Sequence, residues 1–242
     1  MRAALVPEWP RERRAIVVNA IGVGFATAAY GISFGAFAVG GGLSVLQAQI
    51  LSVVMFTGGS QFALVGVLAA GGGVSSAVAT STLLGVRNAF YGLSMAPVLD
   101  VRGRRRLVAA QLTIDESTAM AIGRSGPGET LRAERLAFWA TGLSVFVLWN
   151  LATLAGSFGA GFIGDPRTYG LDAAIGAGLL ALVWPRLVDR RSIGVAVVSA
   201  AVALALTPFL QPGVPVLLTA VVAVVAGVSA VREKLERQAE AA

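Results

Sequence analysis

The 242-residue sequence contains no cysteine and no histidine. A chain without these residue types forms no disulfide, and it lacks the thiolate and imidazole ligands of the usual zinc and haem sites. The absence of histidine also removes the side chain that most often shuttles protons near neutral pH. No arrangement of nucleophile, base and orienting residue is visible either. We therefore expect a protein that is not an enzyme and that needs no cofactor or metal.

Charged residues are scarce, at 13% of the chain, against about 25% in soluble domains. Hydrophobic residues make up 56%, and the mean hydropathy is +0.76. Apolar runs cover residues 16–39, 45–70, 74–99, 136–162, 171–184, 193–210 and 214–231. Most of them can cross about 30 Å of hydrocarbon as a helix that rises about 1.5 Å per residue. The sequence predicts an all-α polytopic membrane protein with about seven hydrophobic segments, in which residues 1–242 form a single transmembrane domain in the lipid bilayer of the cytoplasmic membrane.

The basic residues outnumber the acidic ones by 19 to 13, which gives a net charge of +6. They lie in short loops and tails beside the apolar runs, as the positive-inside rule describes for cytoplasmic loops. We therefore expect no nucleic-acid partner. The longest polar stretch, residues 100–135, holds seven arginines. We predict that it is a basic, amphipathic cytoplasmic loop, in which residues 107–122 form one amphipathic helix.

The N-terminal half presents a problem of topology. The arginines among the first 14 residues favour a cytoplasmic N-terminus, but three simple crossings would place it on the side opposite to residues 100–135. Either the N-terminus is external, or one glycine-interrupted segment in this half is broken or re-entrant. We prefer the second solution, because broken helices are common at the binding sites of transporters.

A pair of glycines, Gly58 and Gly59, lies inside the apolar run 45–70 and is followed by Ser60 and Gln61. Each glycine weakens a helix by roughly 1 kcal/mol relative to alanine. An unwound turn that contacts a solute is one interpretation. Close helix packing through small residues is the other, and both stay open here. For Gly31 and Gly35 we favour packing.

Arg87 is the only charged residue of the run 74–99 and lies near its centre. Such a charge costs about 2.5 kcal/mol or more unless it finds water or a partner. In one interpretation its guanidinium clamps the carboxylate of a solute through two hydrogen bonds. In the other, it is a structural arginine satisfied by helix-end carbonyls or lying at an interface.

Three acidic residues are candidates for binding an ammonium group or for coupling a proton. If the segment of Asp115 and Glu116 dips into the membrane, burial there makes a carboxyl group easier to protonate, and the group can bind an ammonium group or relay a proton. On sequence alone, a solvated position on a cytoplasmic helix is the favoured interpretation of both. Asp172 starts an apolar run and is either a helix cap or first-turn acid or a third coupling residue.

The order of several short motifs resembles the AzlC family of branched-chain amino acid exporters over about residues 30–185. The motifs are Gly42-Leu-Ser44, Leu51-Ser52, Phe56-Thr-Gly-Gly-Ser-Gln-Phe62, Arg87 with Tyr91, Ser94 and Pro97, Leu112-Thr-Ile-Asp-Glu-Ser117, and Leu171-Asp172 leading to Trp184-Pro185. One departure is at Gly85, because many members place an Asn shortly before the arginine, whereas here Asn88 follows it. The resemblance implies export of branched-chain or similar neutral amino acids, driven by an ion gradient and assisted by a small membrane partner of the AzlD type.

The working hypothesis is a secondary exporter with its site among the first three segments. We expect Arg87 to meet the carboxylate, the turn from Gly58 to Gln61 to contact the solute, and Asn88 and Tyr91 to belong to the same substrate site. The acids Asp115, Glu116 and Asp172 would meet the ammonium group or the coupling proton. The alternative is a membrane subunit that does not transport and that scaffolds or regulates a partner.

Overall fold

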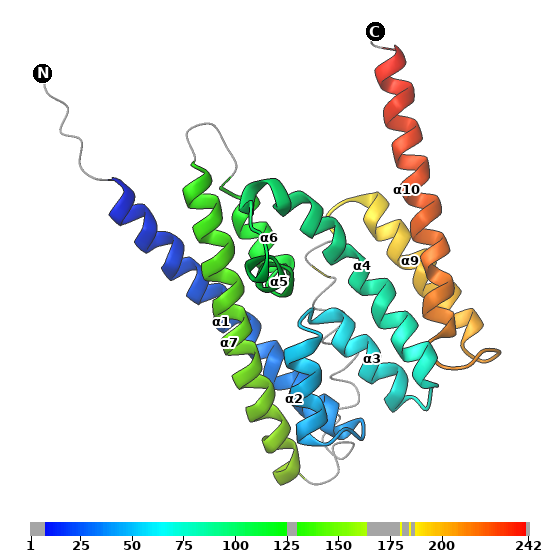
Figure 1. The fold of residues 1–242 in the computed structure, drawn as a ribbon. Helices are drawn as coiled ribbons and strands as arrows, with labels where there is room; N and C mark the ends of the chain where they lie inside the picture. The colour runs from blue at the N-terminus through cyan, green and yellow to red at the C-terminus, as the bar shows by residue number, and fades with distance from the viewer. Residues whose placement is uncertain (1–7, 125–129, 164–179, 181–183, 185–186, 241–242) are drawn as a thin grey trace, which may run out of the picture.

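A computed structural model describes residues 8–124, 130–163, 180, 184 and 187–240. The described residues form helices joined by turns, with no strand among them, so the all-α prediction is confirmed. The helices are α1 (Glu8–Gly40), α2 (Val45–Val54), α3 (Gly59–Ala69), α4 (Val74–Leu99), α5 (Arg104–Gln111), α6 (Asp115–Ile122), α7 (Leu131–Ile163), α9 (Arg190–Leu206) and α10 (Val214–Glu240). Figure 1 shows their arrangement.

Three of the described helices, α1, α7 and α10, contain a stretch that is long and apolar enough to cross a membrane. Helix α4 has 26 residues and coincides with the apolar run 74–99, but Arg87 and several hydroxyl side chains make it more polar. Helix α9 has 17 residues and covers most of the run 193–210. The run 171–184 lies outside the described residues except at positions 180 and 184.

The apolar run 45–70 is broken into two short helices, as the glycine pair predicts. Helices α2 and α3 have 10 and 11 residues, so each spans only about 15 Å, half of the hydrocarbon core. In Figure 1, α2 runs toward the middle of the molecule and α3 returns to the end from which α2 started. A Cβ placed on Gly41, before α2, would lie 3.3 Å from the Cβ of Ala69 at the end of α3. The two helices therefore form a re-entrant hairpin.

Because this hairpin does not cross the membrane, only α1 and α4 would cross before the basic stretch of residues 100–135. The N-terminus and that stretch can then lie on the same side. Figure 1 places the start of α1 and the end of α10 at the same end of the molecule, opposite the turn between α3 and α4. Helices α5 and α6 lie between the upper parts of α4 and α7. That this end faces the cytoplasm remains a prediction of the charge distribution.

Helices α1 and α7 pack closely along their length because α1 carries glycines on the contact face. A Cβ on Gly31 would lie 3.0 Å from the carbonyl oxygen of Trp149, and one on Gly35 would collide with the carbonyl oxygen of Thr153. On the other helix, a Cβ on Gly156 would collide with the carbonyl oxygen of Ile32. The packing interpretation of Gly31 and Gly35 is confirmed.

The single amphipathic helix expected over residues 107–122 is wrong. Helix α5 ends at Gln111 and α6 begins at Asp115, so the chain turns between them. Within the turn, the Ser117 hydroxyl donates to the carbonyl of Leu112 (2.6 Å) and accepts from the backbone N–H of Ile114 (3.1 Å). Leu112 and Ile114 are buried in the core. Burial of these two apolar residues and the local serine bonds together stop the helix.

Candidate functional site

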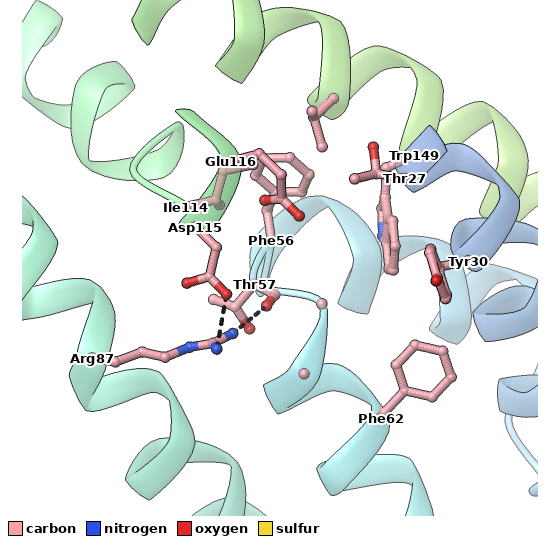
Figure 2. Close-up of a pocket in the computed structure, with 13 residues that line it drawn as sticks. Thr27, Tyr30, Phe56, Thr57, Phe62, Arg87, Ile114, Asp115, Glu116 and Trp149 are labelled. Atoms are coloured by element: carbon pink, nitrogen blue, oxygen red, sulfur yellow. Dashed lines mark hydrogen bonds and ion pairs between the residues drawn. The ribbon is translucent and has the colours of Figure 1, made fainter. Parts of the chain in front are cut away.

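A cavity of about 90 Å³ lies where α1, α4, α6 and α7 meet the break between α2 and α3. It has room for several water molecules or a small organic solute. Figure 2 shows the side chains around it. They are Thr27, Tyr30, Phe56, Thr57, Gly58, Gly59, Phe62, Arg87, Ile114, Asp115, Glu116, Val145 and Trp149.

The break itself is held by a glycine and a glutamine. Gly58 has φ +62° and ψ −86°, a conformation that side-chain-bearing residues rarely adopt. The fully buried side chain of Gln61 accepts from the N–H of Gly58 (3.0 Å) and donates to the carbonyl of Leu51 (3.4 Å). Gln61 therefore ties the end of α2 to the start of α3, and it does not line the cavity.

The ends of the two half-helices point toward the middle of the molecule, where their backbone groups need partners. On the α2 side, Gln111 donates to the carbonyl of Val53 (2.7 Å). Gly58 and Gly59, at the N-terminus of α3, line the cavity. An N-terminus of a helix carries a partial positive charge and unpaired N–H groups, so this wall of the cavity favours an anion.

Arg87 connects three elements at the edge of the cavity. Its Nη1 lies 2.9 Å from Oδ2 of Asp115, and its Nη2 donates to the carbonyl of Thr57 (3.4 Å) (Figure 2). The side chain of Arg87 is 30% exposed and that of Asp115 is 19% exposed. Within the part of the chain that the structure describes, the buried Nε of Arg87 has no hydrogen-bond partner. Arg87 therefore contacts a backbone carbonyl in the break between α2 and α3, as a structural arginine would, and also faces the cavity.

Asp115 and Glu116 are the first two residues of α6, and both line the cavity. Acidic side chains in the first turn of a helix are stabilised by its dipole. In Figure 2 the carboxylate of Glu116 extends into the space between α6 and the side chains of Thr27 and Trp149. Both acids are only partly exposed, so they differ from the solvated cytoplasmic position that the sequence favours.

Of the other residues expected at the site, the four that the structure describes lie outside the cavity lining; they are Ser60, Gln61, Asn88 and Tyr91. Ser60 is 1% exposed and lies against α4, where a Cβ on Gly85 would be 3.5 Å from its hydroxyl. Asn88 donates to the carbonyl of Thr113 (3.2 Å) and so joins α4 to the turn before α6. Tyr91 is half-buried, one turn beyond Arg87. Asp172 lies outside the described residues.

An aromatic wall is the part of the site that the sequence interpretation missed. Trp149 on α7 is 6% exposed and stacks on Phe34 with ring centroids 6.0 Å apart. Phe34 also meets Phe62 edge-on at 5.3 Å. Trp149 and Phe62 line the cavity, together with Tyr30 on α1. Phe62 belongs to a motif that carries the family resemblance, whereas the sequence analysis assigned Trp149 and Tyr30 no role at the site.

A comparison with protein-family models matches residues 22–163 to the model described as AzlC protein. This region contains α2 to α6, most of α1 and all of α7, and therefore every described residue of the cavity. Searches of the curated proteins and of the solved structures found no match. The match covers more than half of the chain, and the chain accordingly belongs to the AzlC family, which is associated with amino-acid transport.

Proposed function

We propose that this protein is a secondary transporter that exports branched-chain or similar neutral amino acids across the cytoplasmic membrane. The observation that carries the proposal is the cavity at the α2–α3 break, which combines one cation, two carboxylates, a helix N-terminus and an aromatic wall. Transporters place their substrate sites at broken helices in this way. An ion gradient would drive export, and a small AzlD-type membrane protein would be the partner.

The carboxylate of the solute would bind between Arg87 and the N-terminus of α3. Arg87 already holds one carboxylate, that of Asp115, at 2.9 Å. A guanidinium has five N–H donors in a planar fork, so it can hold a second carboxylate or exchange the first for it. The N-terminus of α3, where Gly58 and Gly59 line the same cavity wall, adds the positive end of the helix dipole, which favours an anion.

The ammonium group and the coupling ion would use the acids of α6. When a solute carboxylate takes the place of Asp115 at Arg87, the freed Asp115 carboxylate becomes available to bind a proton or another cation. Glu116 lies beside it on the same cavity wall and is placed to meet the ammonium group. Exchange of partners at Arg87 would in this way link solute binding to ion binding.

The solute side chain would lie against Trp149, Phe62 and Val145, which are apolar and face the cavity. Burial of a hydrocarbon side chain here stabilises the complex by about 0.8 kcal/mol for each CH₂ group. The cavity of about 90 Å³ favours a small neutral amino acid over a long charged one. Branched-chain side chains fit both conditions, because they are compact and apolar.

The proposal is tested by counterflow in proteoliposomes. The purified chain is reconstituted alone and with an AzlD-type protein. The vesicles are loaded with unlabelled leucine, valine, alanine or lysine, and entry of the same amino acid in labelled form is measured. We expect accumulation of leucine and valine well above that of lysine, and loss of accumulation in Arg87→Gln. If no amino acid accumulates under either condition while the protein stays folded, the chain is a subunit that scaffolds or regulates a partner.

A further inference from the structure

A second cavity, of about 550 Å³, lies beside α4 and α5 and shares no lining residue with the proposed amino-acid site. Its long wall is the last three turns of α4, where the residues that line it include Gly92, Leu93 and Ala96. Ala109 and Ala110 of α5 line the facing side. Small residues on both sides give the groove an apolar surface against which a hydrocarbon chain can pack.

The charged residues of this cavity are gathered beyond the end of α4. Arg102 and Arg106 line it there, and Asp100 is the only acid among the described residues of the lining. Both arginines are exposed. Over the described ranges, neither forms a salt bridge or a side-chain hydrogen bond with the chain. The two guanidinium groups are thus available to a ligand that carries negative charge at one end.

The surface around the groove is apolar and exposed. Leu93, which lines the groove, is 72% exposed, and Phe90 on the same helix is 63% exposed. In a membrane-spanning helix these side chains face the hydrocarbon, so the groove opens toward lipid and its arginine end lies near a headgroup region. A free phosphate would use only the arginines, and an uncharged lipid would use only the groove.

We propose that this cavity binds one anionic phospholipid, whose phosphate contacts Arg102 and Arg106 and one of whose acyl chains lies along α4 over Gly92. Guanidinium groups bind phosphate through charge-assisted hydrogen bonds, and basic pockets between helices at the cytoplasmic side of a membrane recognise anionic headgroups. The proposal uses no residue of the amino-acid cavity and does not depend on transport.

The chain offers matched controls for both halves of the site. Arg104 and Arg105 belong to the same basic cluster but do not line the cavity, so R104Q/R105Q changes the net charge as much as R102Q/R106Q does. For the groove, a Cβ on Gly92 meets nothing within 4 Å, and the same holds for Gly22 on α1. The Cβ of G92L therefore enters the groove without meeting other atoms, the change leaves the charge unaltered, and G22L is its control.

The experiment is native mass spectrometry of the full chain, purified in detergent with equal amounts of phosphatidylglycerol and phosphatidylcholine. We expect the wild type to retain one phosphatidylglycerol in preference to phosphatidylcholine. R102Q/R106Q should lower that retention about tenfold or more, since each arginine near a headgroup contributes substantially to binding. G92L should lower it as well, whereas R104Q/R105Q and G22L should stay close to wild type.

Three results would overturn the proposal. Equal losses in the two arginine double variants would mean that the basic cluster attracts anionic lipid without a defined site. Unchanged retention in G92L would mean that no acyl chain occupies the groove. Unchanged retention in R102Q/R106Q would leave the cavity to another occupant, such as an acidic segment of a partner protein. Size-exclusion chromatography of each variant establishes that the measured species is folded.

Discussion

Arg87 of α4 and Asp115 of α6 form an ion pair of 2.9 Å at the wall of the cavity, although 27 residues separate them in the chain. The pair joins α4 to the short helix α6, which lies within the basic stretch of residues 100–135. Because neither side chain is fully exposed, the pair is not expected to be as weak as a surface salt bridge. The proposed mechanism depends on this pair, because the carboxylate of the amino acid would replace Asp115 as the partner of Arg87.

The first prediction concerns Asp115. Asp115→Asn removes the charge that would bind the coupling ion, so export against a concentration gradient should be lost while counterflow of amino acid continues. Glu116→Gln makes the same charge change at the next position of α6, but it should weaken counterflow and gradient-driven flux together, because Glu116 is placed to meet the ammonium group of the amino acid. Comparison of gradient-driven flux and counterflow in proteoliposomes decides the question. Gradient-driven export by Asp115→Asn at the wild-type level would remove Asp115 from the coupling role.

The second prediction concerns the fork of Arg87. Arg87→Lys keeps the positive charge but loses the planar pair of donors, so the affinity for the amino acid should fall by roughly 1–3 kcal/mol, about ten- to a hundredfold. Folding should change little, because lysine can still reach Asp115. The measurement is thermal stabilisation by the amino acid and by its amide, which lacks the carboxylate. A lysine variant with wild-type affinity and an unchanged preference for acid over amide would contradict the carboxylate role.

The third prediction concerns Gly58. Gly58→Ala should destabilise the protein by about 1–3 kcal/mol, because alanine is strained at a positive φ of +62°. Steric crowding is not the reason, since the nearest atom to an added Cβ is 3.9 Å away on Trp149. Gly22→Ala, inside α1, is the control, and it should raise stability slightly. Equal melting temperatures for the two variants in detergent would show that the break does not depend on this conformation.

The fourth prediction concerns the re-entrant hairpin. The chain has no cysteine of its own, so single cysteines report their side of the membrane directly. Arg11→Cys and Arg104→Cys should react only from the cytoplasm, and Ser75→Cys, in the first turn of α4, only from outside. All three positions are exposed. Labelling of position 11 from outside, with position 104 protected, would instead support three simple crossings before the basic loop.

The sequence was sufficient for the features that depend on local composition. Long apolar runs predicted the membrane helices, and α4 coincides with the predicted run 74–99. The Gly58 and Gly59 pair allowed either a break or close packing, and the structure has the break between α2 and α3. The mismatch in charge parity indicated a broken segment in the N-terminal half without saying which one.

The sequence does not show which neighbours in space a side chain meets. Gln61 was expected to contact a solute, but its amide is used between Gly58 and Leu51. Asn88 follows Arg87 directly, yet the helical turn aims it at the carbonyl of Thr113 rather than into the cavity. Trp149 gave almost no signal, because one tryptophan in an apolar helix is compatible with many positions.

The sequence by itself determined that this protein is a bundle of membrane helices with one broken segment and a basic side, because chain length, hydropathy and backbone flexibility act within a few neighbouring residues. Only the tertiary structure decided that Arg87 meets Asp115 and Thr57, and that Trp149 and Phe62 face them across one cavity. The partners come from different helices, and a polar group in a low-dielectric interior takes whichever partner the packing brings within hydrogen-bond distance.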